Sequence, residues 1–462
     1  MFIFHFLVVR NRLKTPLILI KSMDASNLIF ALCLGLASFL FVKNVMRIKR
    51  NIQIGLDIDR SDKPMLRWKT MALVALGQSK MTVRPVAGFL HVLVYVGFVV
   101  INIEVLEIII DGLFGTHRVF SFLGGVYDFL IGSFEILAFL VLVACVIFAV
   151  RRNVIQIKRL VMKEMDGWPK TDANLILIFE ILLMSAFLLM QSADLHLQNL
   201  GADHYVQAGS YPISSWCLPL FSSLDIPSAY LMERSFWWFH ILGILIFLNY
   251  LPYSKHLHII LAFPNTYFSN LDAKGGFTNM DSVTQEVKMM MDPNADPYAV
   301  SDDGSKEETP QRFGAKDVND LNWVQLMNAY SCTECGRCTA ECPANQTGKL
   351  LSPRKIMMDT RDRLEEYSAN ITTNDYESED GLSLLDNYIT RDELWACTSC
   401  NACTQACPIN IDPLSIIIDM RRYLVMEESA APTELNMMFN NIENNGAPWQ
   451  FSAVDRLKWR DE

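Results

Sequence analysis

The chain has 462 residues, of which 51% are hydrophobic, and a formal net charge of −10. This mixture indicates a membrane part joined to an acidic soluble part. The acidic balance also argues against nucleic acid as a partner, because phosphate backbones bind basic surfaces.

The first 22 residues do not fit the pattern of the rest. They carry Arg10, Arg12, Lys14 and Lys21 in a stretch too short and interrupted for a membrane span, without the small-residue cleavage site of a signal peptide. Met23, by contrast, begins an uncharged-to-acidic stretch that suits an outward N-terminus. We expect residues 1–22 to be an extension upstream of a true start at Met23, or else a short interfacial segment.

Five apolar runs are long enough to cross the hydrocarbon core of a bilayer. The sequence therefore predicts a five-span membrane domain over residues 23–265, with no spanning run after Ala262. The runs are Leu28–Met46, Val86–Ile110, Val126–Val150, Leu175–Met190 and Phe236–Leu251.

Basic residues set the expected orientation of these spans. Lys and Arg are frequent after the first span (Arg47, Lys49, Arg50) and after the third (Arg151, Arg152), whereas residues 192–232 contain neither. Because cytoplasmic loops carry the excess of Lys and Arg, five spans place the C-terminal part in the cytoplasm, where thiols stay reduced.

Histidines near the spans suggest a haem. His240 and His258 are 18 residues apart, so on one continuous helix both leave the same face about 27 Å apart. His91 lies at the start of the second span, at the depth expected for His258. An intramembrane imidazole is costly without a partner, and haem iron is a suitable one. We expect His91 and His258 to hold a haem b; the alternative is that each is an interfacial histidine that reaches water.

The segment from Phe239-His240 to Lys255-His256-Leu257-His258 resembles the last span of the respiratory nitrate reductase gamma subunit, a five-span di-haem b cytochrome. Membrane heterodisulfide reductases and electron-transfer-flavoprotein:menaquinone oxidoreductases contain the same module. The resemblance covers about residues 27–265. It implies an all-α five-helix bundle in which His91 and His258 form the cytoplasm-side haem pair and His240 is one ligand of an outer haem.

The second ligand of that outer haem is the point at which the chain departs from the family. Ile101 stands at the corresponding position and cannot bind iron. His196, at the outer end of the fourth span, is the substitute that we expect, with His117 and His204 as alternatives in loops. The sequence thus allows one haem or two.

Carboxylates in or beside the predicted spans are a further class of candidate. Buried acids in membranes are functional candidates, and quinone chemistry needs protons, although Glu104 and Glu107 can also reach the outer headgroups. The five are Glu104, Glu107, Glu135, Glu180 and Asp194.

Residues 266–316 form the expected acidic linker between the two parts. Within it, Pro293–Lys316 is rich in Asp, Glu, Ser, Gly and Pro, a composition typical of a flexible tether.

Two cysteine runs follow, each with the spacing C-x2-C-x2-C-x3-C-P. In this pattern three thiolates hold one [4Fe-4S] cluster and the fourth binds a second cluster. Disulfides would need an oxidising compartment, and zinc ribbons would not need the fourth cysteine or the proline. The predicted pairing is Cys332, Cys335, Cys338 and Cys407 on one cluster, and Cys397, Cys400, Cys403 and Cys342 on the other.

The long gap between the runs argues for an α-helical ferredoxin over residues 317–430. Fifty-four residues separate Cys342 from Cys397, too many for a compact bacterial ferredoxin hairpin. Lys355–Tyr367 and Leu414–Met426 are the expected scaffold helices. Ser352-Pro353 and Asp412-Pro413 precede them and suit helix N-termini.

Two sequence segments resemble the dicluster subunits of heterodisulfide-reductase-like complexes. They are Asn345-Gln-Thr-Gly-Lys-Leu-Leu-Ser-Pro-Arg-Lys355 and Asp419-Met-Arg-Arg-Tyr-Leu-Val425. Fused relatives continue into cysteine-rich CCG domains after a tail like residues 431–462. This chain has no CCG motif and no Gly-rich flavin loop, so we expect that tail to dock a partner and the substrate-converting centre to lie on another subunit. No catalytic residue is assigned.

The expected function is therefore that of an oxidoreductase subunit in the bacterial inner (plasma) membrane. Electrons would pass between menaquinone and a cytosolic CCG-domain subunit or electron-transfer flavoprotein, through haem b and two [4Fe-4S] clusters. The alternative is a membrane-anchored iron–sulfur redox sensor that carries no respiratory flux.

Overall fold

The computed structural model describes residues 24–293, 312–373 and 380–461. These residues form two compact units. The first comprises the chain up to Arg50, Lys63–Phe268 and Tyr330–Gly336; the second comprises Asn51–Asp62, Ser269–Ala329 and Arg337–Glu462. The predicted segment 1–22 and most of the predicted tether lie outside the described residues.

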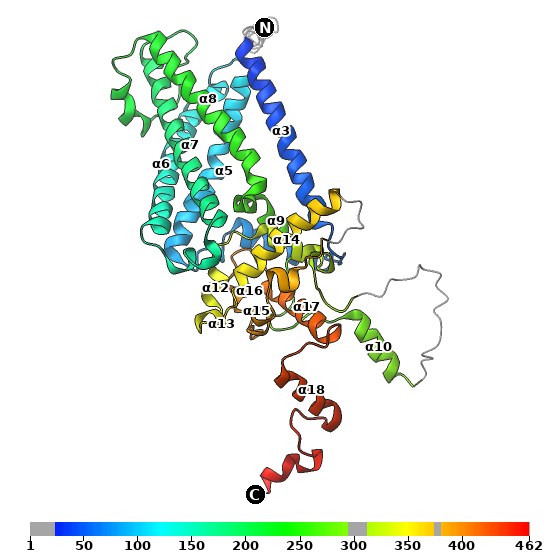
Figure 1. Cartoon of the computed structure of the whole chain (residues 1–462). Coiled ribbons are helices and arrows are strands. Elements are labelled where there is room, and N and C mark those ends of the chain that lie inside the picture. Colours follow the sequence, from blue (N-terminus) through cyan, green and yellow to red (C-terminus); the bar gives the residue numbers. More distant parts are fainter. Residues whose placement is uncertain (1–23, 294–311, 374–379, 462) are drawn as a thin grey trace, which may run out of the picture. The chain divides into compact units, whose positions relative to one another are not determined.

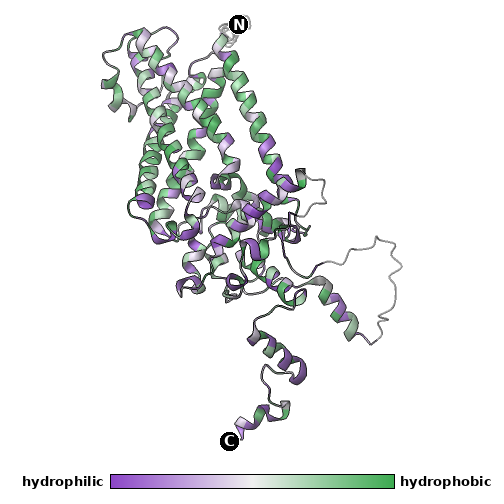
Figure 2. Cartoon of the chain, in the orientation of Figure 1, coloured by the Kyte–Doolittle hydropathy of each residue, from purple (hydrophilic) through white to green (hydrophobic). Residues whose placement is uncertain are grey.

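Five long helices build the first unit, and each is long and apolar enough to cross a membrane. The five predicted spans are thus confirmed, as is the all-α fold. Figure 1 shows these helices, and the colours of Figure 2 show that most of their residues are hydrophobic. They are α3 (Ala25–Ile52), α5 (Pro85–Phe114), α6 (Gly125–Asn153), α7 (Trp168–Asn199) and α8 (Ile226–Tyr250). Shorter elements join them: α4 (Pro64–Met71), the π-helical turn Ala72–Leu76, α9 (His258–Tyr267) and the 3-10 turns Val119–Leu123, Lys158–Leu160, Lys163–Met165 and Ser214–Leu220.

Close side-chain packing holds the bundle together. Helix α7 packs against α6 and α8, and α5 packs against α6. Phe30, Phe187 and Ile241 in the core have no exposed surface. Gly112 lets α3 approach α5, because a Cβ atom there would lie 2.7 Å from the Phe30 ring, closer than packed carbon atoms allow.

The helix that was expected to carry both His240 and His258 is interrupted. Helix α8 ends at Tyr250, and two 3-10 turns, Leu251–Tyr253 and Lys255–Leu257, precede α9. Pro252 favours the break because it has no N–H for the helix ladder. Asp172 secures the bend by accepting hydrogen bonds from the Ser254 hydroxyl (2.7 Å) and the Lys255 amide (3.1 Å). The same-face spacing expected for these two histidines therefore does not hold.

The second unit is a set of short helices around α14 and α17, which pack against each other. Leu364, Ile356, Ile416 and Leu424 are fully buried there. The helices are α10 (Asp281–Met291), α11 (Trp323–Ser331, whose last residues belong to the first unit), α12 (Arg337–Glu341), α13 (Pro343–Gln346), α14 (Pro353–Thr373), α15 (Arg391–Trp395), α16 (Ala402–Ala406), α17 (Pro413–Met426) and α18 (Thr433–Asn445). The turns are Val318–Asp320, Leu384–Tyr388 and Ala453–Arg460.

Helix α10 lies inside the stretch that the sequence predicts as a linker, so this part of the linker is helical. The predicted scaffold helices correspond to α14 and α17. Only isolated β-bridges, and no strand, occur in the described residues. One of them joins Leu56, in the loop after the first span, to Asn322 before α11; the Leu56 amide donates to Leu321 O at 2.8 Å.

Candidate functional site

The second cysteine run and Cys342 come together in the second unit. Helix α12, which ends just before Cys342, packs against α16, which contains Cys403. Burial raises the pKa of the Cys397 thiol, and the nearby thiols of Cys342 and Cys400 raise it further. Burial likewise raises the pKa of Cys403 to about 12, with a contribution from Cys397. Cys342 thus lies beside the second run, although 54 residues separate them in sequence.

The donor set of these cysteines is that of an iron–sulfur cluster, with thiolates as the ligands. No three His, Cys, Asp or Glu side chains in the described residues converge closely enough to hold one metal ion. In a cubane each thiolate binds a different iron, so its four cysteines surround the cluster instead of meeting at one point. No disulfide joins the cysteines of the described chain. The residues present therefore fit the predicted [4Fe-4S] group.

Both cysteine runs fold in the same way locally. The second residue after the first cysteine has a left-handed backbone in each run: Glu334 has φ 54° and Ser399 has φ 57°. The residue after the second cysteine does too: Gly336 has φ 69° and Asn401 has φ 61°. Such turns aim successive amides inward, and the Ser399 amide lies 3.4 Å from the Cys397 sulfur. The internal repeat seen in sequence is thus a repeat of backbone conformation.

Neighbouring side chains hold these loops in place. Asp412 caps α17 by accepting from the amides of Leu414 (3.1 Å) and Ser415 (3.2 Å), as predicted for Asp412-Pro413. Arg421 donates to the carbonyl oxygens of Leu394 and Cys397 at 2.5 Å and lies over the Trp395 ring. The loop that opens the second run is therefore fixed by α17.

The first run is divided between the units. Cys332 and Cys335 belong to the first unit, and Cys338 and Cys407 to the second. In the first unit, the Glu334 carboxylate accepts from Lys255 Nζ, and the Cys335 carbonyl accepts from Arg159. The Cys407 sulfur accepts from the Ile411 amide at 3.3 Å. The Lys255–Glu334 pair was not predicted from the sequence, because no local pattern indicates a contact between two residues so far apart in the chain.

His91 and His258 are brought together. Their ring centroids are 6.4 Å apart, with an interplanar angle of 44°. An imidazole nitrogen lies ~2 Å from a metal that it binds and the ring centre ~1 Å behind it, so two rings on one iron have centres about 6 Å apart. His258 Nδ1 lies 3.1 Å from the Lys255 carbonyl oxygen. Metal-binding histidines commonly donate their second ring N–H in this way, so the pair fits a bis-histidine haem.

His240 shares one feature with His258, a ring nitrogen close to a backbone carbonyl oxygen, but in the described part of the chain it has no histidine facing it as His91 faces His258. Its Nδ1 lies 3.0 Å from the Leu183 carbonyl oxygen. Its Nε2 is buried and has no hydrogen-bond partner in the described chain. Ile101, where the related cytochromes have the second ligand, is packed in the apolar core. His240 could thus offer one ligand nitrogen to iron.

The structure does not bring His196 to His240. His196 Nε2 contacts the Leu224 carbonyl oxygen at 3.1 Å. His196 and Leu183 lie on the same helix, 13 residues apart, which corresponds to ~20 Å along the axis. His240, which contacts Leu183, is therefore far from His196. His117 and His204 form a separate pair in the loops, with ring centroids 5.8 Å apart.

Comparison with known proteins identifies the iron–sulfur part of the chain. Residues 331–411 match the 4Fe-4S dicluster domain family. A probable iron-sulfur-binding oxidoreductase of Bacillus subtilis, FadF, is 30% identical over 95% of this chain and 61% of its own length. The EtfAB:quinone oxidoreductase of Syntrophomonas wolfei is 27% identical over 88% of this chain and 55% of its own. A component of the dihydromethanophenazine:CoB–CoM heterodisulfide reductase of Methanosarcina mazei is 29% identical over 31% of this chain and 35% of its own.

The chain spans about three fifths or less of the length of these relatives. No solved structure matches it. The predicted resemblance to iron–sulfur proteins of heterodisulfide-reductase-like and flavoprotein:quinone-oxidoreductase-like systems is confirmed. The chain is accordingly a membrane protein with a 4Fe-4S dicluster domain, related to electron-transferring oxidoreductase subunits.

Proposed function

We propose that the chain passes electrons between menaquinone in a bacterial plasma membrane and a cytosolic partner, through haem b and two [4Fe-4S] clusters. The observation that carries the proposal is the His91–His258 pair, which has the ring separation of a bis-histidine iron site. One chain would thus join a membrane haem to an iron–sulfur domain. The quinone oxidoreductase among its relatives favours quinone as the membrane substrate.

Eight cysteines would hold the clusters with the crossover predicted from their spacing. Cys397, Cys400, Cys403 and Cys342 would hold one, supported by the approach of Cys342 to the second run. Cys332, Cys335, Cys338 and Cys407 would hold the other. Bound clusters and haem supply one-electron chemistry, and the chain's residues fix their ligands and surroundings.

The partner would bind the acidic, cytoplasmic part of the chain. The name of the EtfAB:quinone oxidoreductase suggests an electron-transfer flavoprotein as the partner, and the sequence resemblance to heterodisulfide-reductase-like complexes suggests a CCG-domain iron–sulfur subunit as the alternative. Residues 431–462 offer a surface for it, since large apolar side chains there are exposed, among them Met437, Phe451 and Trp459. Exposed apolar groups of this kind commonly mark interaction sites.

The test is the reduction of the purified protein by a naphthoquinol. The full chain would be extracted from membranes, and menadiol would be added under anaerobic conditions while haem absorption and cluster paramagnetic signals are followed. We expect haem and then clusters to be reduced. Reduction by dithionite but not by menadiol would overturn a quinone-linked function and leave the redox-sensor alternative.

A further inference from the structure

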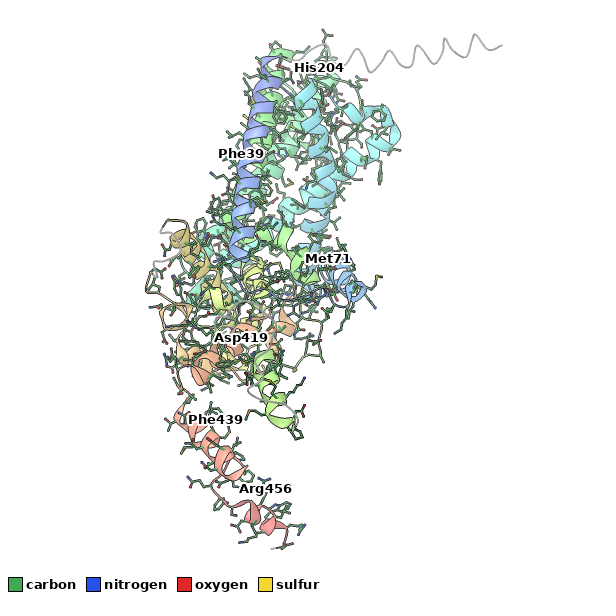
Figure 3. All side chains as sticks on the ribbon, turned by 90° about the vertical axis from the view of Figure 1, so that its right-hand side faces the viewer. Phe39, Met71, His204, Asp419, Phe439 and Arg456 are labelled. Atoms are coloured by element: carbon green, nitrogen blue, oxygen red, sulfur yellow. The ribbon has the colours of Figure 1, made fainter. Side chains whose placement is uncertain are left out.

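A small charged cavity lies inside the first unit, near one end of its long helices. Its volume is about 50 Å³, and a buried water needs ~10–15 Å³ on this measure, so a few waters fit. Residues of α5, α7, α8 and the intervening loops line it, with exposed His204 among them. Figure 3 labels His204 at this end and Met71 at the other end of the unit. The cavity thus lies at the end of the bundle away from Met71.

The lining of the cavity carries more acid than base. Five carboxylates, from Glu104, Glu107, Asp111, Asp194 and Glu233, face it together with two arginines, Arg118 and Arg234, and two histidines. Even if both histidines are protonated, one negative charge stays uncompensated. An unpaired charge buried between membrane helices is costly. At least one of these carboxyl groups therefore holds a proton.

Four of the carboxylates are well supplied with donors. Glu107 accepts from the Phe120 amide and the Tyr127 hydroxyl, both at 2.8 Å. Asp111 accepts from the Arg118 amide at 2.7 Å and from the Thr116 hydroxyl.

The other two pair with arginine. Arg118 donates through Nε and Nη2 to Asp194, at 2.9 and 2.5 Å. Arg234 pairs with Glu233 at 2.5 Å, and Glu233 also accepts from the Tyr205 hydroxyl. All four are stabilised as anions by these contacts.

Glu104 is the exception. Its Oε1 accepts one hydrogen bond, from Gln191. Its Oε2 is buried and has no partner in the described chain, and the residue is only 3% exposed. The missing proton therefore belongs on Glu104, where an O–H can point into the cavity.

A polar route leads from Glu104 to the surface. Gln191 accepts from Arg118 Nη2, Arg118 pairs with Asp194, and Asp194 Oδ2 lies 3.3 Å from His117 Nε2. The His117 ring lies beside exposed His204. Because a guanidinium does not release its proton, protons would pass by cavity water and the two histidines, while Arg118 and Gln191 hold the carboxyl in place.

We propose that Glu104 is a proton-binding residue that exchanges protons with the aqueous phase at this end of the bundle. The role deepens the proposed function and rests on it. When a quinol is oxidised, two O–H bonds break, two electrons reduce the membrane redox centre in one-electron steps, and two protons leave. Glu104 accepts each proton as an O–H bond and releases it to the cavity. Quinone reduction would run the same path in reverse.

Charged or titratable groups from every neighbouring element either line the cavity of Glu104 or lie close behind its wall, and together they set the proton affinity of Glu104. They are Glu107 and Asp111 on α5, Tyr127 and Glu135 on α6, Asp194 on α7, Glu233 and Arg234 on α8, and His117, Arg118, His204 and Tyr211 in the loops. Changing any of them should shift the pH response, but only a change at Glu104 removes the proton-binding group itself.

The direct test is infrared spectroscopy of the full protein in membranes during a pH titration in H2O and D2O. We expect a protonated-carboxyl band that titrates and shifts in D2O. Glu104→Gln should remove it. Glu104→Asp should keep a shifted band, which covers the case that the glutamine variant folds poorly. Glu135→Gln is the matched control: Glu135 is fully buried on α6 with one unpartnered oxygen, but it does not line the cavity. Its loss should shift the pH at which the band titrates without removing the band.

The kinetic readout is haem reduction by menadiol over a range of pH. Glu104→Gln should slow it at least tenfold and flatten its pH dependence, with reduction by dithionite unchanged. An unaltered band and pH profile in Glu104→Gln would overturn the proposal. If the wild-type band titrates but menadiol fails to reduce the haem, the proton site stands and the quinone-linked function falls.

Discussion

At the scale of single residues, the cysteine loops depend on two left-handed positions in each run. Asn401 has φ 61° where the first run has Gly336 at φ 69°. Asparagine tolerates this conformation and glycine adopts it freely, but a β-branched residue does not. Only a few residue types, glycine and asparagine among them, can therefore occupy this position in either run.

We predict that Asn401→Gly keeps full iron content, whereas Asn401→Val lowers the stability of the iron–sulfur part by about 1–2 kcal/mol or more. Iron per chain and the thermal midpoint of cluster absorbance measure both effects. Gly336→Asn is the matched control in the other run and should be tolerated. Equal iron loss in the glycine and valine variants would show that iron retention depends on the asparagine side chain and not on the backbone conformation at residue 401.

A second residue-scale feature is the buried pair of Lys255 and Glu334. Both side chains are at least nine-tenths buried, and Lys255 Nζ also donates to the Pro169 carbonyl at 2.7 Å. Glu334 lies between Cys332 and Cys335. Lys255 lies three residues before His258, and its carbonyl oxygen contacts the His258 ring.

Removing one partner of a buried ion pair leaves the other charge uncompensated, at a cost of about 3–5 kcal/mol. We predict that Lys255→Met lowers the thermal midpoint of the purified protein and that the double variant with Glu334→Gln recovers much of the loss. Differential scanning fluorimetry in detergent compares the three. A double variant less stable than Lys255→Met would contradict a mutual pairing.

At the scale of elements, helix α17 supports the second cysteine run. The Asp412 cap satisfies two amides at the N-terminus of α17, and Arg421, further along the helix, holds the Leu394 and Cys397 carbonyl groups. The position of the loop that opens the second cysteine run therefore depends on the stability of α17.

We predict that Asp412→Ala destabilises the iron–sulfur part by about 1 kcal/mol, the usual cost of losing an N-cap, and speeds loss of iron to a chelator. Asp412→Asn or Asp412→Ser keeps an acceptor and should restore most of the stability. The rate of iron transfer to a chelator, followed by absorbance, gives the comparison. An asparagine variant as labile as the alanine variant would exclude capping as the cause.

Elements marked by a local pattern could be predicted from sequence, and those made by distant contacts could not. Hydropathy identified the five spans, and cysteine spacing identified the dicluster domain, because both signals are local. The break after Tyr250 is marked locally only by Pro252, and the bend that follows is held by Asp172, 78 residues away from Tyr250. Likewise, the contacts around Glu104 come from four helices and two loops, and no local pattern shows which carboxyl oxygen lacks a donor.

At the scale of the whole molecule, the number of haems decides how far electrons travel across the membrane. The rings of His91 and His258 have centroids 6.4 Å apart, and together they would supply both ligands of the proposed haem. His240 has a buried, unpartnered Nε2 within the described chain, but Ile101 occupies the position of its partner. His196 lies ~20 Å along α7 from the carbonyl that His240 contacts. A second bis-histidine haem therefore lacks a second histidine.

We predict one haem b per eight cluster irons in the purified protein, measured as pyridine haemochrome against total iron after subtraction of the haem iron. His91→Ala and His258→Ala should each abolish the same low-spin signal, because bis-imidazole ligation needs both rings. His240→Ala should leave haem content unchanged, and so should His196→Ala. Two haems per eight irons, with one lost in His240→Ala, would mean that a ligand other than His196 completes an outer site. With one haem, the quinone must exchange electrons close to His91 and His258, whereas Glu104 lies 13 residues further along α5 than His91, ~20 Å away. Protons that use Glu104 would therefore travel from the quinone through water between the helices before they leave by the other end of the bundle. Separate routes for electrons and protons would then make the reaction sensitive to the membrane potential, a dependence that a single-sided enzyme does not show.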